Sequence, residues 1–345
     1  MYTEEDIASA VKAGVMPATT AQAFREHVAQ LGQSSLVDEE YFRLVSGFND
    51  VFVVIASVLL LSAVAFLGAL VSPGIGGLAV AAFAWGLAEF FTRVRRMALP
   101  SIVLLFAFIG GTFFGVMLLL GTNIHIENPS ETLFLLKIFI SATAAGLAAW
   151  AHWNQFHVPI TVAVGVAAGA AAIVAVLLMM LEQWFGFISL TPLLFVVGVT
   201  VFLLAMKWDM SDIERQTGRS DVAFWLHLLA APLLVHPVFT ALTASGGQVT
   251  GLQGLSVVGV YLLVALISIC VDRRALMVSA LAYVLFAFTA LFKKYGMETL
   301  GLAPVAFIIG AALLALSAFW HPIRVRVFQL LPSRIQNYLP PVRAN

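Results

Sequence analysis

Charged residues are scarce in this chain of 345 residues. Asp, Glu, Lys and Arg make up 10% of it, whereas about 25% is usual in a soluble domain. A water-soluble protein of this length needs far more charge to cover its surface, but a lipid-facing exterior must be apolar. Hydrophobic residues reach 61%, against roughly 45–50% in soluble domains, so the composition predicts an integral membrane protein.

Cysteine is also nearly absent, and the signatures of several enzyme classes are missing. Cys270 is the single cysteine, so neither an intramolecular disulfide nor a cysteine-based metal cluster can form. The formal net charge is zero, which gives no basic surface for nucleic acid. The sequence lacks a phosphate-binding glycine-rich loop, HExxH, GxSxG and an Asp-rich metal motif. We therefore expect no cofactor, no metal site and no catalytic residues.

Long hydrophobic runs fill most of the chain after residue 50. About 20 helical residues cross the hydrocarbon core of a bilayer, which is about 30 Å thick. The runs show no alternation of polar and apolar residues, so they predict helices and not barrel strands. We expect an all-α protein with ten transmembrane helices, at residues 51–71, 74–92, 99–120, 132–151, 158–181, 187–206, 222–242, 255–271, 275–292 and 299–320.

The predicted domains are a helical module at 1–48, a transmembrane domain at 49–322 and a tail at 323–345. In the module, Thr3 and Asp6 fit a capping box and Gly14 fits a helix stop. Amphipathic patterns follow near residues 19–32 and 38–48. With the N-terminus inside, 15 of the 18 Lys and Arg residues fall on the cytoplasmic side. This asymmetry predicts that both termini are cytoplasmic.

The seventh run carries an unusual set of polar residues and prolines. Pro232 and Pro237 each remove a backbone hydrogen bond and push on the carbonyl four residues earlier, at Leu228 and Leu233. Interrupted helices of this kind often line binding sites in transporters. His227 and His236 project from different parts of the circumference and are a poor pair for one metal. The alternative is a kinked helix packed in the bundle, with its histidines hydrogen-bonded to neighbours.

Glu89, near the end of the second run, is the clearest candidate for a buried acid. A carboxylate inside a membrane helix costs roughly 2.5–3.5 kcal/mol, which makes Glu89 a candidate functional residue beside His227, Pro232, His236 and Pro237. Arg93 offers a structural alternative, because a Glu and an Arg four residues apart lie on one helix face. His152 is expected in the loop after the fourth run, where no Cys or Asp accompanies it.

Two glycine pairs have the spacing that lets membrane helices approach closely. They are Gly111 with Gly115 and Gly165 with Gly169. We expect them to pack either within the bundle or between protomers of a homo-oligomer. They indicate close packing and no chemistry.

The N-terminal region resembles a known family. The segment EEDIASAVKAGVMPATTAQAFREHVAQ, followed by YFRLVSGFNDVFVVIASVLLLSAVAFLGAL, is similar to bacterial predicted membrane proteins of domain of unknown function 2157. There, a short helical pair with an Ala-Gly-hydrophobic turn precedes apolar spans. The resemblance covers roughly residues 4–70 and implies a bacterial inner membrane location. It implies no activity and no functional residues.

Two functional hypotheses follow from the sequence. The first is a transporter or permease for a small solute or lipid, since ten spans can divide as five plus five and pair the second run with the seventh. The second is a non-transporting membrane scaffold or sensor whose N-terminal module binds a cytoplasmic partner. An intramembrane enzyme is a third alternative, which the missing acid, base and nucleophile set disfavours.

Overall fold

The computed structural model describes residues 4–24, 48–122, 131–185, 190–213, 215, 217–243, 251–274, 276–277, 281, 285, 303–336 and 338–340. Every regular element in these ranges is a helix, which confirms the all-α prediction. By its internal contacts the chain divides into two units. One comprises Met1–Arg43 with Arg343–Asn345, and the other comprises Leu44–Val342.

The smaller unit begins with α1 (Glu4–Lys12). Gly14 follows with a φ of 71°, and the Val15 N–H donates to the carbonyl of Ala10, as in a Schellman cap. The predicted helix stop at Gly14 is therefore confirmed. Residues 18–24 are helical again, with Ala21 buried. The rest of the expected module, residues 25–47, lies outside the described residues.

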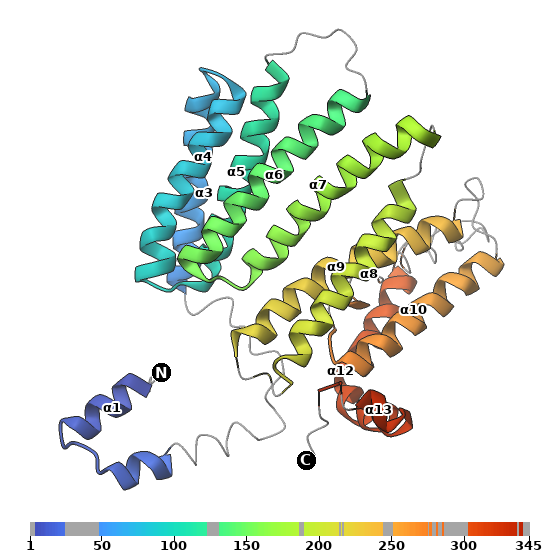
Figure 1. Ribbon diagram of the computed structural model, residues 1–345. Coiled ribbons are helices and arrows are strands. Elements are labelled where there is room, and N and C mark those ends of the chain that lie inside the picture. The colour runs from blue at the N-terminus through green and yellow to red at the C-terminus, as the bar shows by residue number, and fades with distance from the viewer. Residues whose placement is uncertain are drawn as a thin grey trace. The chain divides into compact units, whose positions relative to one another are not determined.

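The larger unit consists of long hydrophobic helices (Figure 1). Eight helices in the described part of the chain are long and apolar enough to cross a membrane, so the protein is a multi-pass membrane protein. The expected ninth span, residues 275–292, falls almost wholly outside the described ranges. The elements are α3 (Phe48–Ala69), α4 (Pro73–Ala88), the π-helix η1 (Glu89–Val94), α5 (Ala98–Thr122), α6 (Glu131–Phe156), α7 (Ile160–Phe185), α8 (Leu190–Met210), α9 (Gly218–Thr243), α10 (Gly251–Val271), α12 (Ala303–Leu330) and α13 (Ser333–Gln336).

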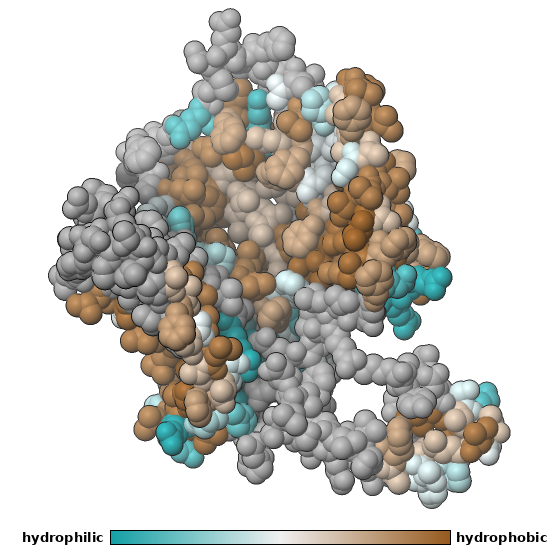
Figure 2. Space-filling model, turned by 180° about the vertical axis from the view of Figure 1, so that it is seen from behind, coloured by the Kyte–Doolittle hydropathy of each residue, from teal (hydrophilic) through white to brown (hydrophobic). Residues whose placement is uncertain are grey.

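The outward faces of these helices suit lipid. Figure 2 shows hydrophobic side chains over much of the visible surface, and large apolar side chains such as Leu59, Leu203 and Leu314 are more than half exposed.

The predicted boundary between the transmembrane domain and the tail differs from the structure. The tail was expected from residue 323, but α12 continues through Pro322 to Leu330, and the chain then turns back into α13.

Four helix-connecting turns share a backbone feature. After η1, α6, α8 and α10, one residue that is not glycine has a positive φ: Arg96 (51°), His157 (53°), Arg215 (55°) and Asp272 (58°). They recur at intervals of about 60 residues, as expected for successive helical hairpins. Because consecutive helices run antiparallel, the four turns lie at one end of the helices, toward the bottom of Figure 1. We call this the turn end.

Glycines set the close contact between α4 and α5. A Cβ added to Gly77 would lie 2.6 Å from the Gly115 Cα, and one added to Gly111 would lie 2.7 Å from the Gly77 carbonyl oxygen. The face formed by Gly111 and Gly115 is therefore filled by α4 of the same chain. Gly169, in contrast, has no described atom within 4 Å of an added Cβ. The first pair thus packs within the chain, and Gly165 does so too, since its added Cβ would lie 3.3 Å from the Ala149 Cβ of α6; oligomerisation through the face of Gly169 stays a prediction.

Helix α9 is the most enclosed of the eight spans. Half of its most apolar stretch is buried (50%), against 11–28% in the other seven. It packs closely on α8 and also on α7, but it makes few contacts with α10. A Cβ added to Gly198 of α8 would lie 2.8 Å from the Leu233 carbonyl carbon, so α8 approaches the backbone beside the carbonyl that Pro237 disrupts. A repeat of five plus five spans would require α9 to pack on α10 as closely as α4 packs on α5. The described residues of α9 and α10 do not show this close packing.

Candidate functional site

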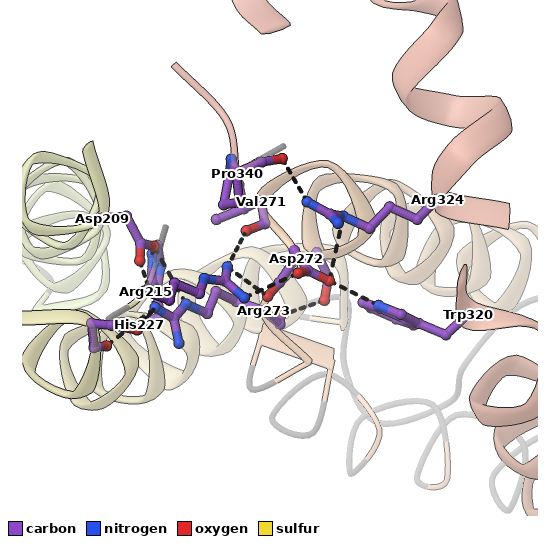
Figure 3. Close-up of polar contacts among 11 residues, drawn as sticks. Asp209, Arg215, His227, Val271, Asp272, Arg273, Trp320, Arg324 and Pro340 are labelled. Carbon is purple, nitrogen blue, oxygen red and sulfur yellow. Dashed lines mark hydrogen bonds and ion pairs between the residues drawn. The ribbon is translucent and has the colours of Figure 1, made fainter. Parts of the chain in front are cut away.

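A network of buried charged residues joins several helices at the turn end (Figure 3). Its members come from the end of α8, from α9, from the turn after α10 and from α12. Asp209, Asp272, Arg273 and Arg324 are each at most 5% exposed. Because segments far apart in sequence supply these side chains, the network ties the second half of the chain together.

Asp209 and Arg273 form the centre of one part of this network. The Arg273 Nη2 donates to Asp209 Oδ1 at 2.5 Å, and the Nε donates more weakly to Oδ2 at 3.4 Å. The same Nη2 reaches the Ser220 carbonyl oxygen at 3.1 Å and its hydroxyl oxygen at 3.2 Å. One guanidinium therefore holds the end of α8 and the start of α9.

His227 adds a third partner to Asp209. Its Nε2 lies 2.8 Å from Asp209 Oδ2, and the imidazole is fully buried beside the Phe202 ring. An ionised carboxylate only accepts hydrogen bonds, so Nε2 carries the proton and donates. The Nδ1 atom then has no hydrogen-bond partner within the described ranges. Asp209 thus orients the imidazole and fixes its tautomer.

Asp272 organises the second part of the network. Its Oδ2 accepts from Arg215 Nη1 at 3.0 Å, and its Oδ1 accepts from Trp320 Nε1 at 2.9 Å. The Arg324 Nε lies 3.4 Å from the same Oδ1. Arg215 also donates to the carbonyl oxygens of Val271 and Asp272, both at 3.1 Å. Asp272 therefore joins the loop after α8, the end of α10 and helix α12.

The two parts together hold three arginines and two aspartates. Burial lowers the pKa of Arg215, as does the nearby Arg273, while Asp272 and Asp209 act in the opposite direction. A guanidinium still keeps its proton at neutral pH, so these are permanent charges. A buried ion pair of this kind is often no more stable than apolar residues of the same volume, because each ion loses several kcal/mol of hydration. The network is therefore weak evidence for stability.

Only one of the five predicted site residues belongs to this network. His227 binds Asp209, whereas Pro232 and His236 are exposed and Pro237 is buried in α9. Glu89 begins η1 and pairs with Arg93 at 3.1 Å, as the structural alternative predicted. It also accepts a hydrogen bond of 2.6 Å from Gln155 of α6. The structure thus does not bring Glu89 together with the polar residues of α9.

His152 occupies a different place from the expected loop. It lies within α6 and is fully buried, with its Nδ1 3.1 Å from the Thr161 hydroxyl oxygen of α7. The rings of Trp85 and Phe156 surround it. The error arose because α6 stays helical through the polar sequence His-Trp-Asn-Gln. Within the described residues, no group of three or more His, Cys, Asp or Glu could hold a metal ion.

Sequence reasoning missed most of the network. The prediction of membrane orientation used Arg215, Arg273 and Arg324 only as cytoplasmic charges. It gave no role to Asp209 and Asp272. A signal was present, since both aspartates stand at the end of an apolar helix, where each can meet a basic residue of another loop. Such positions sit between lipid and water, where a charge is buried only when it is paired.

Comparison with known proteins gives no relative. No protein-family model, no curated protein and no solved structure matches this chain. The resemblance of residues 4–70 to a bacterial membrane family therefore stays a prediction, and the function has to be inferred from the site itself.

Proposed function

We propose that this protein is a transporter of a small solute or lipid in the bacterial inner membrane, with both termini in the cytoplasm. The observation that carries the proposal is the buried charged network at the turn end. It joins the end of α10 to α8, α9 and α12, which otherwise contact α10 through apolar side chains such as Val235, Val257 and Ile309. Alternating access requires a contact of this kind, which is stable when closed and can still separate.

The geometry suggests how the closed state is held. Arg273 links the end of α10 to α8 and α9, and Asp272 links it to α12. Helix α9 would form one wall of the pathway, because its prolines interrupt the backbone bonding and His236 is exposed in its second half. Separation of Arg273 from Asp209 would open the turn end, which the positive-inside rule places in the cytoplasm.

A cysteine at position 236 tests for this pathway. We expect His236→Cys in a Cys270→Ser background to react with a membrane-impermeant thiol reagent at least about tenfold faster than a lipid-facing cysteine. The reason is that an ionised thiolate forms and reacts in water, not in hydrocarbon. The measurement is the rate of labelling in sealed membrane vesicles.

Leu203→Cys in the same background is the matched control. Leu203 lies in the middle of α8 and is 61% exposed, so lipid should cover it. If both cysteines stay unreactive in folded, monodisperse protein, no aqueous pathway reaches α9 and the transport proposal is wrong.

One observation favours the second candidate, a membrane scaffold or sensor. The N-terminal residues form a separate compact unit, and α1 is amphipathic with exposed positions such as Ser9. A separate helical unit can bind a cytoplasmic partner without any transport. Deletion of residues 1–36 should abolish the cellular phenotype if this is the function, and should leave solute movement intact if transport is.

A further inference from the structure

The chain folds back on itself after α12. At Leu331 it leaves the helix, forms the short helix α13 and returns toward the charged network. The Gln336 side chain fixes this reversal, because its Nε2 donates to the carbonyl oxygens of Phe328 at 3.0 Å and Leu331 at 2.8 Å. These carbonyls lie at the C-terminal end of α12, so Gln336 caps that helix.

The returning segment contacts Arg324 through Pro340. The Arg324 Nη2 donates to the Pro340 carbonyl oxygen at 2.7 Å, and Leu339 and Pro340 are both buried. We refer to residues 332–336 and 338–340 as the C-terminal strap. Tyr338, in the same strap, is 62% exposed. Leu339 and Pro340 therefore cover the network, but the rest of the strap does not.

Arg324 is shared between the strap and the network. Its guanidinium lies between the Pro340 carbonyl and Asp272, and the side chain is 1% exposed. Without the strap, this end of Arg324 would face water. Water would then compete for the guanidinium and weaken its attraction to Asp272, because exposed ion pairs contribute little.

Apart from the polar contacts of Asp272, α12 and α10 are joined by apolar side chains. Away from the turn end, Val257 of α10 and Ile309 of α12 share an apolar cluster; near the turn end, the contact is a small cluster of Ile269, Met277 and Trp320. Trp320 itself is held by its hydrogen bond to Asp272. A segment that stabilises Arg324 therefore acts directly on the contact that joins α12 to the end of α10.

We propose that the C-terminal strap is an autoinhibitory latch: while Pro340 binds Arg324, the strap holds α12 against Asp272 and keeps the turn end closed. Release of the strap exposes Arg324 and loosens α10. Its autoinhibitory role rests on the proposed transport function, but the latch itself is a contact of the closed network and can be tested without a known substrate.

The single cysteine provides the readout in the otherwise unchanged protein. Cys270 precedes Asp272 by two residues and is only partly buried. We expect a chain that ends after Leu331 to react with a thiol reagent about tenfold faster at Cys270, which corresponds to about 1.4 kcal/mol. Equal rates in the full-length and shortened chains, both folded and monodisperse, would overturn the latch.

A second measurement keeps the proposal testable if the shortened chain does not fold. Arg324→Gln removes the guanidinium in the full-length chain and should free the strap. Trypsin should then cut after the exposed Arg334 about tenfold faster. Arg326→Gln is the matched control, since Arg326 lies on the same helix and is exposed. If both variants are cut at the wild-type rate, Arg324 does not hold the strap.

Discussion

Asp209→Asn is expected to lower the free energy of unfolding by about 3–5 kcal/mol, the cost of breaking a buried ion pair by removing one partner. Asparagine has nearly the same shape, so no cavity forms. The loss comes from the charge: Arg273, which is 2% exposed, keeps only neutral oxygens, those of Ser220 and of the asparagine, as partners of its guanidinium among the contacts at this site. The His227 Nε2 also loses the carboxylate to which it donates.

Asp212→Asn is the control for this prediction. Asp212 lies in the loop after α8 and accepts hydrogen bonds from the Thr217 backbone N–H and hydroxyl, at 2.8 and 2.7 Å. These bonds are near the surface, so their loss should cost about 1 kcal/mol. Unfolding midpoints in detergent compare the two variants. Equal small shifts for both would mean that Asp209 and Arg273 are not a buried pair.

Gly111→Ala is expected to destabilise the protein by roughly 1–3 kcal/mol, although alanine is the better helix former. An added Cβ would lie 2.7 Å from the Gly77 carbonyl oxygen and 2.9 Å from the Ala81 amide nitrogen. Both are backbone atoms and cannot rotate away. Helices α4 and α5 must therefore move apart, which loosens the contact along their shared face.

The adjacent Gly110 gives a matched control on the same helix. An added Cβ there meets no described atom within 4 Å, so Gly110→Ala should be neutral or slightly stabilising. Relative to the unchanged protein, Gly111→Ala should clearly lower the thermal unfolding midpoint, whereas Gly110→Ala should leave it unchanged or raise it slightly. If Gly110→Ala destabilises as much as Gly111→Ala, the α4–α5 contact is not the reason.

The membrane helices were predictable because a single physical requirement dictates them. Continuous apolar runs of the right length can only be helices in lipid, so α3 through α10 fall close to the expected ranges. Gly14 was predictable for a similar reason, since few residues adopt the conformation that ends a helix. The role of Glu89 was also among the alternatives, because an Arg four residues later lies on the same helix face.

The charged network was not predictable in the same way. The pairing of Asp209 with Arg273 joins residues far apart in sequence, and it depends on how α8, α9 and α10 pack. Hydropathy gives the length of each span but not its neighbours. The positive-inside rule counts Arg273 as a loop charge and contains no information about burial. For the same reason, His227 was a candidate from its position alone, while its partner Asp209 was not found.

The most direct test of the account is the side from which a cysteine at position 236 can be labelled. In sealed vesicles of known orientation, His236→Cys with Cys270→Ser should react from the side opposite the turn end and stay protected from the turn end. Adding Arg273→Lys keeps the charge, but the lysine side chain is shorter and lacks the Nε donor, so it cannot reproduce the contacts to both Asp209 oxygens and to Ser220. Labelling from the turn end should then rise about tenfold, a difference of about 1.4 kcal/mol. If the cysteine at position 236 is equally protected from turn-end labelling with Arg273 and with Arg273→Lys, this result contradicts the claim that the charged network closes this end of the protein.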